Sequence, residues 1–168
     1  IKKNPIIYHY NEHPRIVEGW KFSSNIKKLS LNKMVLELIT FFYQRKPIPF
    51  STINFLKGTD QPLHSDYLHF GSIPEKYLTA SWIALEDVDK NNGPIQVAIG
   101  SHKLPIIDYN ILKLETPGNI SSLEKNYRVY EQYVRDVVIS NKFKIKDVML
   151  KKGEAIIWAA NLLHGGKK

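Results

Sequence analysis

Short apolar runs separated by turn signals dominate the chain from about residue 50 onward. Phe50–Leu56 alternates between two faces, as a half-buried strand does. Four later runs are also predicted strands: Leu78–Leu85, Ile95–Ile99, Ile145–Leu150 and Glu154–Ala159. Asn91-Asn92-Gly93-Pro94 is the strongest turn signal between them. This succession of short strands predicts a mainly β fold.

Two segments have helical periodicity instead. A helix is predicted from a cap at Ser30 to about Tyr43, and another over about residues 121–140. Each has an apolar stripe on one face, as a helix lying against a sheet requires. Residues 1–26 are expected to be irregular, because Asn4-Pro5 and His13-Pro14 interrupt any helix. Strands with helices packed outside predict a double-stranded β-helix, that is, a jelly-roll or cupin-like barrel.

The length of 168 residues suits a single domain with a sizeable core. We expect residues 1–49 to form a helical and irregular part packed outside a β-helix core over 50–168, with the second helix as an insert at about 121–140. The chain begins without Met and stops shortly after His164-Gly165-Gly166. We therefore expect a fragment truncated at its C-terminus.

Composition excludes several classes of function. Cysteine is absent, so a metal site would need His, Asp or Glu. The net charge is +8, but the lysines are scattered, which favours a solvated surface over a nucleic-acid interface. The apolar runs are too short to cross a bilayer and no signal peptide opens the chain, so we expect a cytoplasmic protein without membrane association.

One short segment carries candidate metal chemistry. His64 and Asp66 are two residues apart, which puts both side chains on one face of an extended segment. One imidazole and one carboxylate are two thirds of the facial triad that holds non-haem Fe(II) with open positions. His164 follows an apolar strand, and a jelly roll can bring it beside the pair. Taken alone, the pair also fits a surface turn, and His164 fits a hydrogen-bonded core histidine. We exclude His69, which would fall on the opposite strand face from His64.

Five blocks in order carry a resemblance to a known family. They are Gln61-Pro62-Leu63-His64-Ser65-Asp66, Ala80-Ser81-Trp82-Ile83-Ala84-Leu85-Glu86-Asp87, Asn91-Asn92-Gly93-Pro94, Gly100-Ser101-His102-Lys103, and Lys152-Gly153-Glu154 leading to Leu163-His164-Gly165-Gly166. Together they resemble the phytanoyl-CoA dioxygenase family, which consists of Fe(II)- and 2-oxoglutarate-dependent oxygenases on a double-stranded β-helix. The resemblance implies Fe(II), 2-oxoglutarate and O2, with His64, Asp66 and His164 as catalytic iron ligands. Halogenating relatives lack the carboxylate, so the presence of Asp66 favours hydroxylation.

The cosubstrate site is less defined. The family anchors 2-oxoglutarate with an Arg on the strand after the second histidine, and the sequence stops at Lys168 before that position. We name Asn54, Thr52, Lys57 and Trp82 as candidate cosubstrate-binding residues. An ordinary half-buried polar strand, a solvated turn lysine and a core tryptophan would explain them as well.

Three functions remain to be distinguished. The first is an oxygenase that hydroxylates a small organic metabolite and decarboxylates 2-oxoglutarate to succinate. The second is a non-catalytic cupin-like module that binds a small molecule or a metal. The third, a basic nucleic-acid-binding domain, has only net charge in its favour. We expect a small-molecule substrate, no nucleic acid and no membrane partner, while the sequence specifies neither the substrate nor the oligomeric state.

Overall fold

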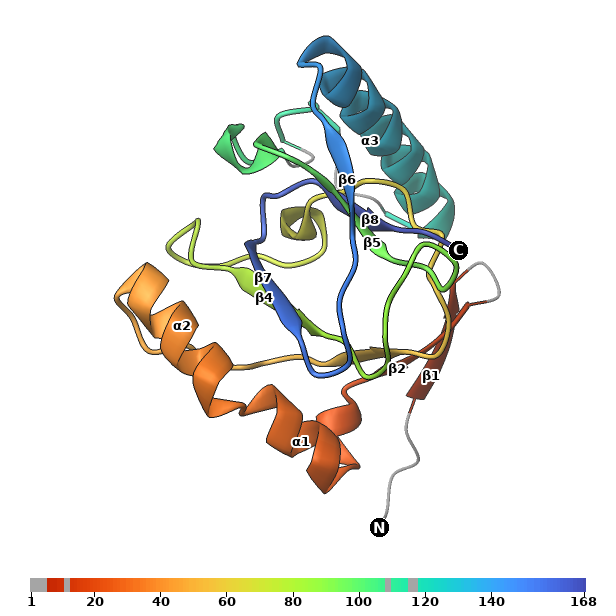
Figure 1. Cartoon of the computed structure of the whole chain (residues 1–168). Coiled ribbons are helices and arrows are strands. Elements are labelled where there is room, and N and C mark those ends of the chain that lie inside the picture. The colour runs from red at the N-terminus through yellow and green to blue at the C-terminus, as the bar shows by residue number, and fades with distance from the viewer. Residues whose placement is uncertain (1–5, 11–12, 108–109, 115–117) are drawn as a thin grey trace. The chain divides into compact units, whose positions relative to one another are not determined.

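The computed structural model describes residues 6–10, 13–107, 110–114 and 118–168 (Figure 1). The chain divides into two compact units: one comprises residues up to Thr59 together with Lys168, and the other comprises Asp60–Lys167. The predicted arrangement, in which residues 1–49 pack outside a core of residues 50–168, stays a prediction.

The first unit contains a three-stranded antiparallel sheet. Its order is β1 (Ile6–Tyr10), β2 (His13–Val17) and β3 (Ile53–Phe55). A short 3-10 turn, η1 (Gly19–Lys21), follows β2. The expectation of an irregular segment over residues 1–26 was wrong for β1 and β2, and residues 1–5 and 11–12 lie outside the described ranges. Pro14 is the second residue of β2 and pairs with β1 only, because the pairing with β3 begins at Arg15. A residue that breaks a helix therefore did not exclude a strand.

The helical part of this unit is split in two. The Ser23 side chain caps α1 (Ser24–Ser30), and the Asn32 side chain accepts from the backbone N–H of Val35 to cap α2 (Lys33–Tyr43). The predicted cap at Ser30 was therefore wrong, because Asn32 is an equally good cap and starts a new helix two residues later. The predicted end at Tyr43 is correct.

The second unit contains two antiparallel sheets (Figure 1). In one, β4 (Thr79–Ile83) pairs with β7 (Ala155–Ala159). In the other, β5 (Ile95–Ala98) lies between β6 (Ile145–Val148) and β8 (His164–Gly166). Each predicted strand of this unit is present, though shorter, and β8 was not predicted. Pairing between strands far apart in the sequence is characteristic of a jelly roll.

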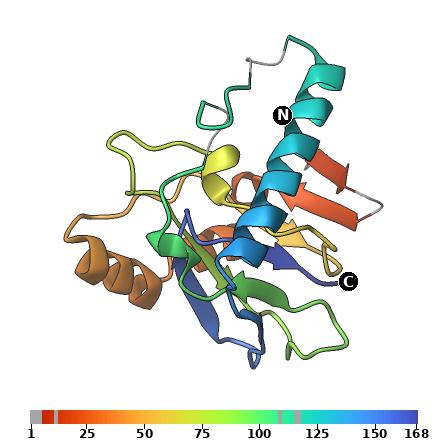
Figure 2. The same ribbon diagram turned by 90° about the horizontal axis from the view of Figure 1, so that it is seen from above.

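The insert predicted at about 121–140 is the helix α3 (Ile120–Ser140), which begins with a capping box formed by Asn119 and Ser122. Its apolar residues Tyr130 and Val134 belong to the core of the second unit. The helix lies beside the three-stranded sheet (Figure 2). The buried cluster consists of Ala98, Ile107, Tyr130, Val134 and Leu163. Two further 3-10 turns complete the unit, η2 (Asp66–Leu68) and η3 (Ser101–Lys103).

Two hydrogen bonds to Asp87 fix the turn that leads into β7. The exposed Asp87 carboxylate accepts from the Lys152 backbone N–H at 2.9 Å and from Lys151 Nζ at 2.9 Å. These bonds, the backbone one foremost, lower the pKa of Asp87 below its usual value. Within the described ranges, no helix has both the length and the hydropathy needed to cross a membrane.

Candidate metal centre

The second unit brings together His64, Asp66 and His164. One potential ligand atom from each lies within 4.8 Å of the others. Both histidines are buried, with 6% and 7% of their surface exposed, and Asp66 is half-buried. Two imidazoles and one carboxylate on one side of a metal form the facial triad expected for non-haem Fe(II), which leaves positions open for other ligands.

Backbone pairing fixes the separation of the two histidines. His64 N–H donates to the His164 carbonyl at 2.8 Å, and His164 N–H donates back to the His64 carbonyl at 2.9 Å. His64 thus forms an isolated antiparallel bridge with His164, on the side of β8 that faces away from β5. Ser65 is extended, with φ −102° and ψ 139°, so the two-residue spacing holds as far as Asp66, where η2 begins.

The close approach of the ligand segment to β8 depends on Gly165. A Cβ atom at Gly165 would lie 2.5 Å from the Gln61 carbonyl oxygen and 3.1 Å from the Leu63 nitrogen. Any larger residue would push the His64 segment away from β8. The glycine after the second histidine is therefore a structural requirement of the site.

Two backbone carbonyls orient the imidazoles. His64 Nδ1 lies 2.9 Å from the Pro62 carbonyl oxygen, and His164 Nδ1 lies 3.0 Å from that of Leu162. Because a carbonyl oxygen can only accept, Nδ1 carries a hydrogen in both rings. Nε2 is therefore the nitrogen that each ring presents to a metal.

The Asp66 carboxylate is oriented by Trp158 on β7. Trp158 Nε1 donates to Asp66 Oδ2 at 3.1 Å, while Oδ1 lies 3.6 Å from His164 Nε2. Oδ1 is therefore the oxygen that faces the imidazoles. Sequence reasoning missed this role, because Trp158 looks like one more apolar residue of a strand until the register of β7 is known.

The side chain of Gln61 lies beside the candidate ligand His64. Its Nε2 is 3.3 Å from His64 Nε2, so the carboxamide donates to the lone pair that a metal would occupy. A metal bound there would displace the carboxamide but leave it beside the site. The donor set, its burial and the tautomers set by the backbone all fit Fe(II).

His69 is outside the group of converging ligand atoms. The predicted cause, a position on the opposite strand face from His64, was wrong. The chain turns into η2 at Asp66, so the alternation of strand faces does not reach His69. Its exposed ring has its centroid 5.6 Å from that of His64 and 5.8 Å from that of Tyr127.

Among the candidate cosubstrate residues, Trp82 shares the second unit with the ligands. Ala80 pairs with Trp158 and Trp82 with Ile156, so Trp82 is on the same face of the sheet as Trp158. Trp82 thus shares a face with the residue that holds Asp66. Its contact with a cosubstrate stays a prediction.

The other three candidates belong to the first unit. Thr52 Oγ1 accepts from the Trp20 backbone N–H at 3.3 Å. Asn54 Oδ1 is buried against Gly19 and has no hydrogen-bond partner among the described residues. Lys57 is exposed in a turn. Cosubstrate binding by these residues also stays a prediction.

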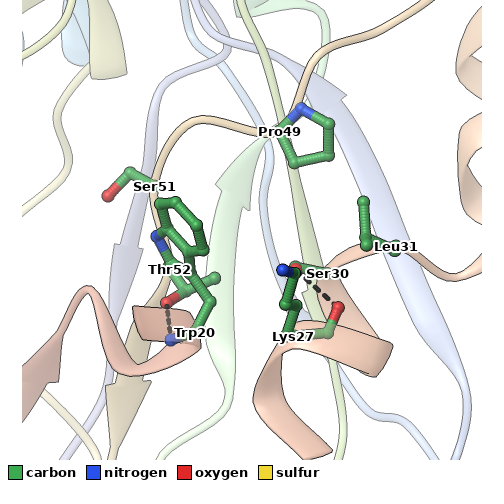
Figure 3. Close-up of a pocket in the computed structure, with 7 residues that line it drawn as sticks. All are labelled: Trp20, Lys27, Ser30, Leu31, Pro49, Ser51 and Thr52. Atoms are coloured by element: carbon green, nitrogen blue, oxygen red, sulfur yellow. Dashed lines mark hydrogen bonds between the residues drawn. The ribbon is translucent and has the colours of Figure 1, made fainter. Parts of the chain in front are cut away.

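The first unit also contains a small, mainly apolar pocket (Figure 3). Its lining consists of Trp20, Lys27, Ser30, Leu31, Pro49, Ser51 and Thr52. The hydroxyl groups are already engaged: Ser30 Oγ donates to the Lys27 carbonyl and Ser51 Oγ donates to Glu18. These hydroxyl groups therefore offer little further polar chemistry to a ligand.

Comparisons of the sequence point to one family. The sequence model of the family described as phytanoyl-CoA dioxygenase matches residues 22–168. Human peroxisomal phytanoyl-CoA dioxygenase is 28% identical over 109 residues, which are 65% of this chain and 29% of the human protein. A probable phytanoyl-CoA dioxygenase of Caenorhabditis elegans is 22% identical over 96% of this chain and 46% of its own length. The chain thus spans less than half the length of these relatives.

Solved structures share the fold. EctD from S. alaskensis with bound Fe superimposes with a TM-score of 0.68 at 17% identity, over 95% of this chain and 54% of EctD. The non-heme alpha ketoglutarate dependent carbocyclase SnoK superimposes with a TM-score of 0.66 at 14% identity, over 97% of this chain and 62% of SnoK. The prediction of a mainly β, jelly-roll fold is confirmed.

Proposed function

Because the chain belongs to the phytanoyl-CoA dioxygenase family, we propose that it is an Fe(II)- and 2-oxoglutarate-dependent oxygenase that hydroxylates a small organic molecule. The observation that carries the proposal is the convergence of His64, Asp66 and His164, with Nδ1 of both histidines bonded to backbone carbonyls so that Nε2 is the nitrogen offered to a metal. The fold shared with EctD, which has been solved with Fe and with 2-oxoglutarate, supports it.

Each residue of the site has a definite task. His64 and His164 would bind Fe(II) through Nε2, and Asp66 through Oδ1. When bound, the iron would supply oxidative decarboxylation of 2-oxoglutarate to succinate and hydroxylation of the substrate by O2. The Pro62 and Leu162 carbonyls hold the imidazole rings, and Trp158 holds the carboxylate.

The carboxylate bears on the type of reaction. Asp66 fills the third protein position of the triad, so this position is not left to a halide. Hydroxylation is therefore the reaction that the donor set supports. A small-molecule substrate and a cytoplasmic location are part of the proposal, while the name of the human relative places that protein in the peroxisome.

The test is an anaerobic Fe(II) titration with and without 2-oxoglutarate, monitored through the weak visible charge-transfer band of the chelate. We expect a band that requires both additions and that disappears in His64→Ala and Asp66→Ala. His102→Ala is the matched control, because His102 is an exposed histidine of η3 outside the converging group. Iron binding without the band would favour the non-catalytic binding module, and absence of iron binding would refute the proposal.

A further inference from the structure

We propose that Tyr130 of α3 is a positioning residue for the metal centre. Its hydroxyl holds the backbone between His64 and Asp66 in the conformation that lets both side chains reach one metal ion. The inference rests on the proposed function and extends it to the inserted helix, which contributes no ligand itself.

The hydroxyl of Tyr130 reaches the ligand segment across the core. Tyr130 has no exposed surface, and its hydroxyl oxygen accepts from the Ser65 backbone N–H at 2.8 Å. A tyrosine at this position of an apolar helix face need only fill volume, as Val134 does one turn later. The hydroxyl group instead satisfies the backbone N–H of the residue between the two ligands.

Two other hydrogen bonds join the segment around Ser65 to the turn that precedes His164. Ser65 is 1% exposed, and its Oγ donates to the Ala160 carbonyl at 2.9 Å. The Asp66 backbone N–H donates to the same carbonyl at 2.9 Å. Ala160 begins the turn that leads to His164, so these two bonds join the ligand segment to that turn. The Tyr130 hydroxyl adds a further bond to this segment, from helix α3.

Loss of the hydroxyl would leave the Ser65 N–H buried without an acceptor. A buried unsatisfied donor is unfavourable enough that the segment would rotate to find another partner. Because His64 and Asp66 flank Ser65, such a rotation changes the distance between their ligand atoms. The expected effect is therefore on metal geometry as well as on folding.

A second tyrosine on the same helix extends the contact. Tyr127 precedes Tyr130 by one helical turn, and their ring centroids are 6.3 Å apart. The Tyr127 ring also lies 5.8 Å from that of His69, which follows η2. The helix α3 thus meets the ligand segment on both sides of Asp66, at Ser65 and at His69.

The test is titration of the metal-free chain with Co(II), whose visible ligand-field bands report affinity and geometry together. Changes in the groups that orient metal ligands typically weaken binding by about 10–100-fold. We expect Tyr130→Phe to fall in this range and to alter the bands. Val134→Ala is the control for a core defect, because Val134 is 1% exposed in the same cluster. It should lower the melting temperature but leave Co(II) affinity and spectrum unchanged.

The outcomes separate this inference from the proposed function. If Tyr130→Phe binds Co(II) like the unchanged chain, or if Val134→Ala loses as much affinity, the positioning role is refuted and the proposed function stands. If the unchanged chain binds no Co(II), both are refuted. Should Tyr130→Phe fail to fold, incorporation of 3-fluorotyrosine at position 130 weakens the hydroxyl as an acceptor without removing it. A smaller loss of affinity in the same direction would support the role, and an unchanged affinity would refute it.

Discussion

Replacement of Trp158 by Phe tests how the Asp66 carboxylate is oriented. The substitution removes the indole N–H that donates to Asp66 Oδ2 at 3.1 Å and keeps an aromatic ring on β7. The carboxylate then loses the bond that keeps Oδ1 turned toward the imidazoles. We expect weaker metal binding with little change in the fold.

The magnitude follows from the type of bond. A hydrogen bond to a charged group contributes about 1.5–3 kcal/mol. The Asp66 side chain is only 16% exposed, so water replaces the lost donor poorly. Since each 1.4 kcal/mol is about a tenfold change in affinity, Trp158→Phe should weaken Fe(II) binding by roughly 10–100-fold.

The assay is an anaerobic competition titration of Fe(II) against a chromogenic chelator. Trp20→Phe is the matched control, because Trp20 Nε1 also donates to a carboxylate, that of Glu18, at 3.1 Å, but outside the site. It should leave Fe(II) affinity unchanged. Equal affinities for Trp158→Phe and the unchanged chain would refute the idea that the indole orients the metal ligand.

Two further substitutions test the backbone of the site and the acid stability of the second unit. Gly165→Ala should abolish metal binding and destabilise the chain by about 1–3 kcal/mol, because the new Cβ overlaps the Gln61 carbonyl; chemical denaturation and Co(II) titration measure both effects. Gly71→Ala, where a Cβ would contact nothing within 4 Å, is the control, and equal effects of the two would contradict the steric explanation. Asp87→Asn should lower the melting temperature at neutral pH. The difference should disappear as pH falls below the unfolded value of about 3.8, because a lowered pKa stabilises the fold only while the carboxyl is charged. Parallel curves of melting temperature against pH would show that the charge of Asp87 contributes nothing.

Local patterns were sufficient for most strands of the second unit. Residues 78–85 and 145–150 are short, mostly apolar runs, and β4 and β6 lie within them. The strand β8 has the sequence His-Gly-Gly, which has no strand preference of its own. It is a strand because β5 and His64 pair with it, and such pairing cannot be predicted from the segment itself.

The candidate site shows the same difference between local features, which the sequence predicts, and long-range contacts, which it does not. The two-residue spacing of His64 and Asp66 is a local feature, so their shared direction could be predicted. The roles of Trp158 and Tyr130 arise from register and from packing of α3, at separations of 92 and 65 residues from their partners. At that distance an apolar pattern gives the burial of a side chain but not the partner of its polar atom.

The reciprocal backbone bonds between His64 and His164 also determine when the site can exist during folding. The two residues are 100 positions apart, and closing a loop of that length costs about 4 kcal/mol of chain entropy. Until that closure is made, only His64 and Asp66 of the three candidate ligands lie together, and the site is incomplete. Metal loading should therefore follow the pairing of β8 and stabilise it by mass action. A chain that has not yet made this pairing would then hold no iron at this site, and iron occupancy would report that β8 has paired.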